Sequence, residues 1–288
     1  MLKFRGVKYY LLSNITRILL GKLRKYHKRE EQLLVFSSDF IGEEIFSYGV
    51  YEKNEISIII ASLDFDISKN NALDLGANIG NHAVQFSNYF KDVYCFEPNK
   101  TVFDVLKINT RNRTNTHLYN FGLSDQNAIS YLNIPDYNFG GASVTASKAK
   151  NTIEIELKIC DDIFDKECAL VKIDIEGHEL QALRGMRKLI AKNKPIICFE
   201  LINTLDSGQD IIKELKELGY KNFYIPYEPR FFMRRKSNSF TMTFLYHLFF
   251  KQKRKLVEVT NFNKRFYNLI LCEQKDSIYR IKKDSIRN

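Results

Sequence analysis

Short apolar segments alternate with helical segments along residues 56–229, and this alternation constrains the fold more than any other feature of the chain. Several of the apolar segments are too continuous for strands that keep one face in water. Strands of that kind are buried on both faces, as in a parallel sheet with helices packed on either side. The sequence therefore predicts an α/β fold built on an open, mostly parallel sheet.

The expected strands are Asn71–Leu75, Val93–Glu97, His117–Phe121, Ala169–Ile175, Pro195–Glu200, Phe223–Pro226 and Leu269–Glu273. The expected helices are Asn81–Phe90, Lys100–Asn112, Glu179–Ala191 and Gly208–Leu218. Two further segments, Ala128–Ile134 and Thr152–Ile159, are expected as an inserted antiparallel pair, because the second alternates with period two. Ligands of such sheets bind beyond the carboxyl ends of the strands, where the strand order reverses.

The net charge of +10 is carried by the two ends of the chain. Residues 1–30 have a net charge of +8 and residues 230–288 of +11, which leaves −9 for residues 31–229. A nucleic-acid enzyme more often concentrates basic charge around its cleft. Basic ends instead favour docking on an anionic membrane or a partner, unless they only reflect a Lys-rich composition.

The charge and the strand pattern predict three parts: a basic helical extension (1–55), a core (56–229) and a basic, aromatic cap with the last strand (230–288). In the cap, several aromatic and basic side chains are candidates for a lid over the ligand cleft, unless they form a packed helical cap. These residues are Phe231, Phe232, Arg234, Arg235, Phe249, Phe250 and Lys251.

Near the beginning of the chain, Leu11, Ile15 and Ile18 recur at helical spacing among basic residues. This pattern predicts a basic amphipathic helix, which either lies at a membrane surface or packs against its own domain. No run of about 18 apolar residues predicts a membrane span. The five cysteines are scattered, as expected for core residues in a reducing compartment. The sequence predicts a cytoplasmic protein, with peripheral contact at the inner face of the membrane if the amphipathic helix lies at the membrane surface and not on its own domain.

Asp74–Gly80, with the sequence Asp-Leu-Gly-Ala-Asn-Ile-Gly, follows the first expected strand and opens a helix. Gly76 and Gly80 allow a tight turn and a close approach of the backbone to a ligand. The free N–H groups of the helix N-terminus would suit a carboxylate or a phosphate. The spacing differs from the three-glycine pattern that holds a pyrophosphate, so a ligand with a carboxylate tail is favoured over a dinucleotide. A turn without a ligand is the alternative.

Glu97 ends the second expected strand, 23 residues after Asp74. An acidic residue about 20 positions after the glycine turn accepts hydrogen bonds from ribose hydroxyls in folds of this kind. The alternative for Glu97 is a carboxylate that caps the next helix. At the end of the third strand, Ser124 and Asp125 are candidates for contacts with an adenine ring, or they form an Asx-type turn.

The segment Lys172–Glu179 gathers three carboxylates and a histidine at the end of a buried strand. Closely spaced carboxylates raise the pKa of at least one of them, and a histidine titrates near neutral pH. His178, Asp174 and Glu176 are therefore candidate catalytic residues, although a lone histidine at this position is more often a surface residue. Asp174 and Glu176 with Glu200 are also candidate ligands for Mg²⁺ or Ca²⁺. No metal-specific spacing is present, so we expect no metal.

Five stretches of the chain together resemble the FkbM family of class I methyltransferases, which depend on S-adenosylmethionine (SAM). They are Leu73–Gly80, Phe96–Pro98, Asn120–Asp125, Val171–Glu179 and Leu183–Gly185, and the resemblance covers about residues 45–203. It implies a Rossmann-like, seven-stranded class I methyltransferase sheet with helices on both faces, and SAM as cofactor. It also implies O-methylation, usually of a sugar or polyketide hydroxyl. Of these, we expect a hydroxyl of a sugar or glycan precursor, such as that of a surface polysaccharide.

By analogy with the family, Asp74, Gly76 and Asn78 would line the methionine end of SAM, and Gly80 and Asp174 are further candidates for binding the cofactor. Glu97 would hold the ribose, and Ser124 and Asp125 the adenine. Family members often have a small residue where this chain has His178, so the role of His178 is not inherited.

The mechanism that the sequence suggests places an acceptor hydroxyl in line with the methyl group. Either His178 or Asp174 would take its proton. Replacing His178 with alanine is expected to lower turnover and to leave SAM affinity nearly unchanged.

The expected acceptors are a sugar, a nucleotide-sugar or a lipid-linked glycan. Two other functions remain open at this point. A nicotinamide-dependent oxidoreductase shares the glycine turn and the ribose carboxylate but lacks the third glycine that is expected of it. A nucleic-acid methyltransferase or binding protein would suit the net charge, but the acidic core argues against a nucleic-acid cleft.

Overall fold

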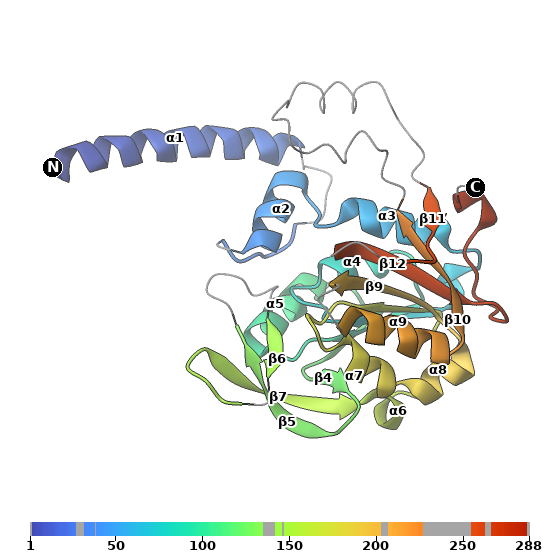
Figure 1. Ribbon diagram of the computed structural model, residues 1–288. Coiled ribbons are helices and arrows are strands. Elements are labelled where there is room, and N and C mark those ends of the chain that lie inside the picture. Colours follow the sequence, from blue (N-terminus) through green and yellow to red (C-terminus); the bar gives the residue numbers. More distant parts are fainter. Residues whose placement is uncertain are drawn as a thin grey trace.

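The buried strands of the chain assemble into one eight-stranded sheet, and four further strands form a second sheet beside it (Figure 1). This arrangement comes from a computed structural model, which describes residues 2–26, 32–37, 39–134, 142–145, 147–202, 207–226, 255–262 and 266–286. The predicted α/β class is therefore confirmed.

The centre of the large sheet is parallel, as its continuous apolar strands require. Its strands are β1 (Asn71–Leu75), β2 (Asp92–Phe96), β3 (Thr116–Tyr119), β8 (Leu170–Ile173) and β9 (Ile196–Ile202), in the spatial order β9-β8-β1-β2-β3. The chain runs from β1 outward through β2 to β3, and later from β8 outward to β9. The strand order thus reverses between β1 and β8, which is where ligands of open α/β sheets bind.

The other end of the large sheet is antiparallel. Strand β12 (Phe266–Gln274) lies between β9 and β10 (Tyr220–Pro226) and runs antiparallel to both. The seven strands from β10 to β3 are the expected sheet. A short eighth strand, β11 (Leu256–Glu258), pairs with the outer edge of β10 and was not predicted.

Helices cover both faces of the large sheet. On one face pack α3 (Lys53–Ser62), α4 (Asn81–Phe86) and α5 (Lys100–Thr110). The 3-10 turn η1 (Ile67–Lys69), which follows α3, and the C-terminal residues around η3 (Lys283–Ser285) lie on the same face. On the other face pack α6 (Cys160–Ile163), α7 (Glu179–Arg184), α8 (Arg187–Asn193) and α9 (Ser207–Glu217).

The single helix expected at Glu179–Ala191 is instead two helices, α7 and α8, which meet at Gly185 and Met186. A Cβ atom on Gly185 would lie 1.9 Å from the carbonyl oxygen of Ser124. The chain thus comes very close to the strand that contains Ser124 at the point where the helix breaks. The first helix was also predicted too long, because α4 ends at Phe86.

The second sheet has the strand order β4-β7-β5-β6. The expected antiparallel pair is confirmed as β5 (Ala128–Asn133) and β7 (Thr152–Ile159), and β6 (Ser143–Thr145) extends it. Residues 122–125 were expected at the end of the third strand, but Gly122–Ser124 form a separate strand, β4, in this sheet. The amide of Asn120 donates to the carbonyls of Glu97 and Pro98 and so turns the chain after β3.

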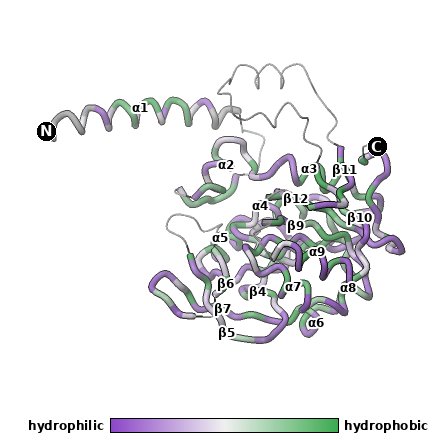
Figure 2. The backbone as a smooth tube through the Cα atoms, in the orientation of Figure 1, coloured by the Kyte–Doolittle hydropathy of each residue, from purple (hydrophilic) through white to green (hydrophobic). Residues whose placement is uncertain are grey.

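The N-terminal extension is helical, as expected. Helix α1 (Leu2–Tyr26) projects away from the sheets in Figure 1, and α2 (Phe40–Tyr48) lies closer to them. Apolar and polar residues alternate along α1 in Figure 2. Among the described residues, none of the helices combines the length and the hydropathy that crossing a bilayer requires. The aromatic and basic residues assigned to a lid, from Phe231 to Lys251, lie outside the described residues.

Candidate functional site

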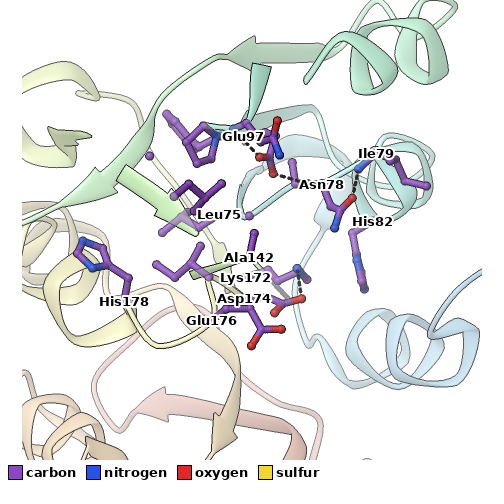
Figure 3. Close-up of a pocket in the computed structure, with 18 of the residues that line it drawn as sticks. Leu75, Asn78, Ile79, His82, Glu97, Ala142, Lys172, Asp174, Glu176 and His178 are labelled. Carbon is purple, nitrogen blue, oxygen red and sulfur yellow. Dashed lines mark hydrogen bonds and ion pairs between the residues drawn. The ribbon is translucent and has the colours of Figure 1, made fainter. Parts of the chain in front are cut away.

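A cavity of about 230 Å³ opens at the carboxyl ends of β1, β2 and β8, between the large sheet and the second sheet (Figure 3). The cavity borders the point where the strand order reverses, as the topology predicts. The apolar part of its wall is formed largely by Phe96 and by side chains of the segment from β4 to β7. These side chains are Leu123, Leu132, Ala142, Val144 and Leu157. The polar part includes Tyr51, Glu97, Lys172, Asp174, Glu176 and Glu200.

The glycine turn after β1 forms the floor of the cavity, with Gly76, Asn78 and Ile79 in its wall. Gly76, Asn78 and Gly80 all have positive φ values, of 74°, 50° and 91°. A Cβ atom on Gly76 would lie 1.9 Å from the carbonyl oxygen of Asp174. The end of the neighbouring strand β8 therefore requires glycine at position 76, whether or not a ligand binds. The sequence did not indicate this second reason for the glycine.

Glu97 joins the glycine turn to the loop after β2. One carboxylate oxygen accepts from the N–H of Asn78 at 3.0 Å, and the other from the N–H of Asn99 at 2.8 Å (Figure 3). Burial raises the pKa of Glu97 to about 7, although both backbone donors act to lower it. Each oxygen keeps a lone pair beyond its backbone partner. Glu97 thus both shapes the turn and retains the capacity to accept from two hydroxyl groups.

Asp74 lies beneath the cavity and is absent from the residues that line it. It is completely buried, and its carboxylate is 3.4 Å from the ammonium group of Lys172. Lys172 is also 3.3 Å from the carboxylate of Asp174. Burial acts to lower the pKa of Lys172, but the carboxylates of Asp174, Asp74 and Glu52 together raise it. A permanently charged lysine therefore lies between the turn and the acidic residues of the cavity.

Asp174, Glu176 and Glu200 converge in the cavity wall. Each offers a carboxylate oxygen that lies within 4.8 Å of the other two. Burial and the charge of Asp174 raise the pKa of Glu176 to about 7 and that of Glu200 to about 8. Three carboxylates this close either share protons or bind a cation such as Mg²⁺ or Ca²⁺. We call these three residues the carboxylate cluster.

His178 lines the same cavity, but its ring lies apart from the carboxylates of Asp174 and Glu176 (Figure 3). Its Nε2 atom is 2.9 Å from the hydroxyl of Ser124, which is also 3.3 Å from the carboxylate of Asp125. Burial lowers the pKa of His178, while Asp125 acts to raise it. Ser124 and Asp125, expected at the adenine, do not belong to the cavity wall, which Gly122 and Leu123 form at that point.

Sequence reasoning missed several residues that line the cavity, among them Phe40, Ile41, Asn81 and His82, and two further contributions. The first is Tyr51, from the connection between α2 and α3, which no motif marks. The second is the apolar face of the second sheet, with Leu132 and Leu157. A signal for this face was present in the period-two alternation of Thr152–Ile159, because one face of such a strand must be covered. A ligand with an apolar ring, a diol and a charged end would match the apolar wall, Glu97 and the polar wall.

Comparison with known proteins identifies similar chains. A family model described as the methyltransferase FkbM domain matches residues 74–221. The hexuronic acid methyltransferase AglP of Haloferax volcanii is 30% identical over 150 residues, which are 50% of this chain and 60% of that protein. The chain thus spans about three fifths of the length of this curated relative.

Among solved structures, the methyltransferase FkbM from Methylobacillus flagellatus is 16% identical. The match covers 86% of this chain and 50% of that one, with a TM-score of 0.46. Fibrillarin from Aeropyrum pernix, solved with bound SAM, is 12% identical. That match covers 59% of this chain and 66% of that one, with a TM-score of 0.38.

Proposed function

Because the chain belongs to the FkbM family of SAM-dependent methyltransferases, we propose that it transfers a methyl group to an oxygen of a sugar or glycan precursor. One observation carries this proposal: Glu97, with free acceptor capacity, and the carboxylate cluster line the same cavity. Methylation of a hydroxyl by SAM needs a carboxylate that binds the ribose of the cofactor and a group that accepts the proton of the hydroxyl. The name of the relative from Haloferax volcanii, a hexuronic acid methyltransferase, supports a sugar as the acceptor.

The residues of the cavity fit SAM. The two oxygens of Glu97 would accept from the ribose hydroxyls, and the apolar wall near Leu123 would receive the adenine, close to Ser124 and Asp125. The turn from Gly76 to Gly80, which Asp74 and Lys172 underlie, would hold the methionine end. When bound, SAM supplies the electrophilic methyl group, on a sulfonium.

The chain itself has two tasks in this reaction: to place the acceptor oxygen and to take its proton. Placement contributes the larger part of such a methyl transfer. We propose that Asp174 takes the proton of the acceptor hydroxyl, because its carboxylate belongs to the carboxylate cluster. The other two members, Glu176 and Glu200, have pKa values of about 7 and about 8, so they are themselves partly protonated near neutral pH. His178, whose Nε2 is engaged by Ser124, would contact the acceptor and would act as the base only after leaving Ser124.

Binding and transfer are tested together. Calorimetry with S-adenosylhomocysteine (SAH), SAM and NADH measures cofactor choice. Transfer of a labelled methyl group is then measured to the methyl glycosides of glucose, galactose, glucuronic acid and galacturonic acid. We expect binding of SAM and SAH, and a labelled product that survives mild alkali, since a methyl ether is stable there and a methyl ester is not.

Each other outcome has a definite meaning. A labelled product that is lost in alkali would move the methyl group from a hydroxyl to a carboxylate. A folded protein that binds NADH and neither SAM nor SAH would contradict the proposal in favour of an oxidoreductase. Binding of SAH without transfer to any of the four sugars would remove these sugars as acceptors.

We also propose that α1 lies on an anionic membrane surface, where a lipid-linked glycan would be presented. Leu2–Tyr26 contains seven Lys or Arg and no acidic residue. Its exposed apolar side chains are Tyr9, Tyr10, Leu11, Leu12, Ile15, Ile18 and Leu19. Leu11, Ile15 and Ile18 share one face of the helix. Apolar residues of this kind with surrounding basic charge suit a helix that lies in the plane of an anionic bilayer surface.

A further inference from the structure

Tyr51 lies in the cavity wall but outside residues 74–221, which the family model matches. Resting on the proposed methyl transfer, we propose that Tyr51 binds the sugar acceptor. We further propose that Asn81 and His82, the first two residues of the helix after the glycine turn, hold it in place. The site that binds the cofactor and the site that binds the acceptor would then be joined through two adjacent side chains.

Asn81 holds the backbone of Tyr51 from both sides. Its side-chain oxygen accepts from the N–H of Tyr51 at 3.1 Å, and its side-chain nitrogen donates to the carbonyl of Tyr51 at 2.9 Å. Asn81 is only 4% exposed and is the first residue of α4, directly after Gly80. A buried amide that exchanges two hydrogen bonds with one residue leaves the backbone of that residue little freedom. The position of Tyr51 is therefore tied to the glycine turn.

The next residue in each segment makes a second link. The carboxylate of Glu52 is 3.2 Å from Nε2 of His82, whose side chain is 8% exposed. Glu52 has a φ of 50°, a conformation that a non-glycine residue adopts only where its surroundings stabilise it. The hydroxyl of Tyr51 also hydrogen-bonds to Glu52. Backbone and hydroxyl of Tyr51 are thus both held, which is expected of a side chain that must meet a ligand in one geometry.

The ring of Tyr51 is also supported. It lies edge-on to the ring of Phe40, with 6.4 Å between the ring centroids, and both residues line the cavity. Burial raises the pKa of the Tyr51 hydroxyl, and the charges of Glu52, Asp174 and Glu200 raise it further. Tyr51 therefore belongs to the same part of the cavity as the carboxylate cluster.

This environment selects the chemistry of its ligand. The hydroxyl of Tyr51 donates its hydrogen bond to the carboxylate of Glu52, so the lone pairs of the hydroxyl oxygen remain to accept from a ligand. The carboxylates of the cluster also accept, and an aromatic ring suits the C–H face of a pyranose. An array of acceptors beside a ring matches a ring that carries several hydroxyls. Phosphate or carboxylate groups of the acceptor would have to point away from the cluster, because like charges repel.

The test uses Tyr51→Phe, with Tyr48→Phe as the matched control. Tyr48 is 62% exposed at the end of α2 and does not line the cavity. The acceptor is whichever of the four methyl glycosides the wild-type protein methylates fastest. We expect Tyr51→Phe to raise KM for this glycoside about tenfold, as one lost hydrogen bond does, with kcat changed less than about threefold. The affinity for SAH should be unchanged, and Tyr48→Phe should match the wild type.

Asn81→Ala tests the positioning role. It should raise KM for the glycoside by a similar factor, and the double variant with Tyr51→Phe should show little further loss, because both changes remove one interaction. Additive losses would overturn the link between the two residues. An unchanged KM in Tyr51→Phe, with normal SAH binding and transfer, would overturn the role of Tyr51 and leave the proposed function intact.

A wild-type protein that transfers no methyl group to the four glycosides would remove these sugars as acceptors of transfer and would not, by itself, contradict the role of Tyr51. In that case binding of methyl β-glucuronoside to the SAH complex is measured by calorimetry. Binding that Tyr51→Phe weakens about tenfold would support the acceptor site. The absence of binding to the wild type would overturn it.

Discussion

At the scale of single residues, Glu97 has an observed structural role and a proposed role in binding the ribose. It accepts backbone N–H groups from Asn78 and Asn99, and in the proposed complex it also accepts from a ribose. Glu97→Ala removes both functions, so we expect SAH to bind about 10–100 times more weakly, as for lost hydrogen bonds to a charged group. Calorimetry measures this change. Asp104→Ala is the control, because Asp104 pairs with Lys100 and Lys107 on the outside of α5. Equal affinities in both variants would contradict the ribose role.

Asp174 and His178 compete for the role of the base, and kinetics of two variants decide between them. We expect Asp174→Asn to lower kcat by about 10²- to 10⁴-fold, the usual contribution of a general base. His178→Ala should cost less than about tenfold, because its Nε2 is engaged by Ser124. In the wild type, kcat should rise with pH through the range from about 7 to about 8, where Glu176 and Glu200 titrate. The reverse order of the two variants would assign the base to His178.

At the scale of elements, the glycine turn between β1 and α4 is built against the end of β8. In Gly76→Ala the new Cβ would meet the carbonyl oxygen of Asp174 at 1.9 Å, at a φ of 74°. Gly177 has a similar φ of 91°, but its Cβ would meet nothing within 4 Å. Gly177→Ala should therefore cost only the conformational strain, about 1–2 kcal/mol of unfolding free energy, whereas Gly76→Ala should cost about 1–3 kcal/mol more. Urea denaturation compares them, and equal losses would show that the close approach to Asp174 is relieved elsewhere.

Helix α1 is the element that we assign to a membrane surface. Ile15→Glu places a charge among its exposed apolar side chains, and Ser13→Glu places the same charge on another face. Both variants lose the same electrostatic attraction, but only Ile15→Glu loses apolar burial, worth about 1.5–3 kcal/mol. We expect Ile15→Glu to bind vesicles of phosphatidylserine and phosphatidylcholine at least about tenfold more weakly than Ser13→Glu in a sedimentation assay. Indistinguishable binding, or no binding by the wild type, would contradict membrane docking.

At the scale of the whole molecule, the acidic cavity makes stability depend on pH. Glu97, Glu176 and Glu200 have pKa values of about 7, 7 and 8 in the folded protein, against an ordinary value of 4.5. Between these values the folded state holds more protons than the unfolded chain, so stability falls as the pH rises. The Tm should therefore fall by at least about 2 °C between about pH 5 and about pH 8.5. In a domain of this size, a loss of about 1 kcal/mol of unfolding free energy is enough for such a shift.

Glu200→Gln is the variant that checks this origin. It removes a carboxylate that must ionise in the cavity near pH 8, so its Tm should fall less than that of the wild type over the same range. Differential scanning calorimetry without ligand measures both curves. Parallel curves for the two proteins would attribute the pH dependence to other groups.

The sequence by itself determined the order of the strands along the chain and the position of the glycine turn. Both are written in local patterns: continuous apolar segments mark the buried strands, and Gly76 and Gly80 mark a turn that other residues adopt at a cost. Glu97 was identified for a similar reason, since an acidic residue that directly follows an apolar strand must lie at its carboxyl end. β1 and β7 have the bounds expected of them, and β11 has no pattern that would distinguish three residues from a loop.

Only the tertiary structure decided how these parts meet. It gathered Glu200 with Asp174 and Glu176, gave His178 the hydroxyl of Ser124 as a partner, and placed Tyr51 against Asn81. It also split a predicted helix at Gly185, where the chain approaches Ser124. Each of these contacts joins segments that are far apart in the chain. A local pattern depends on the period and the conformational preference of neighbouring residues, whereas such contacts depend on how the strands and helices pack.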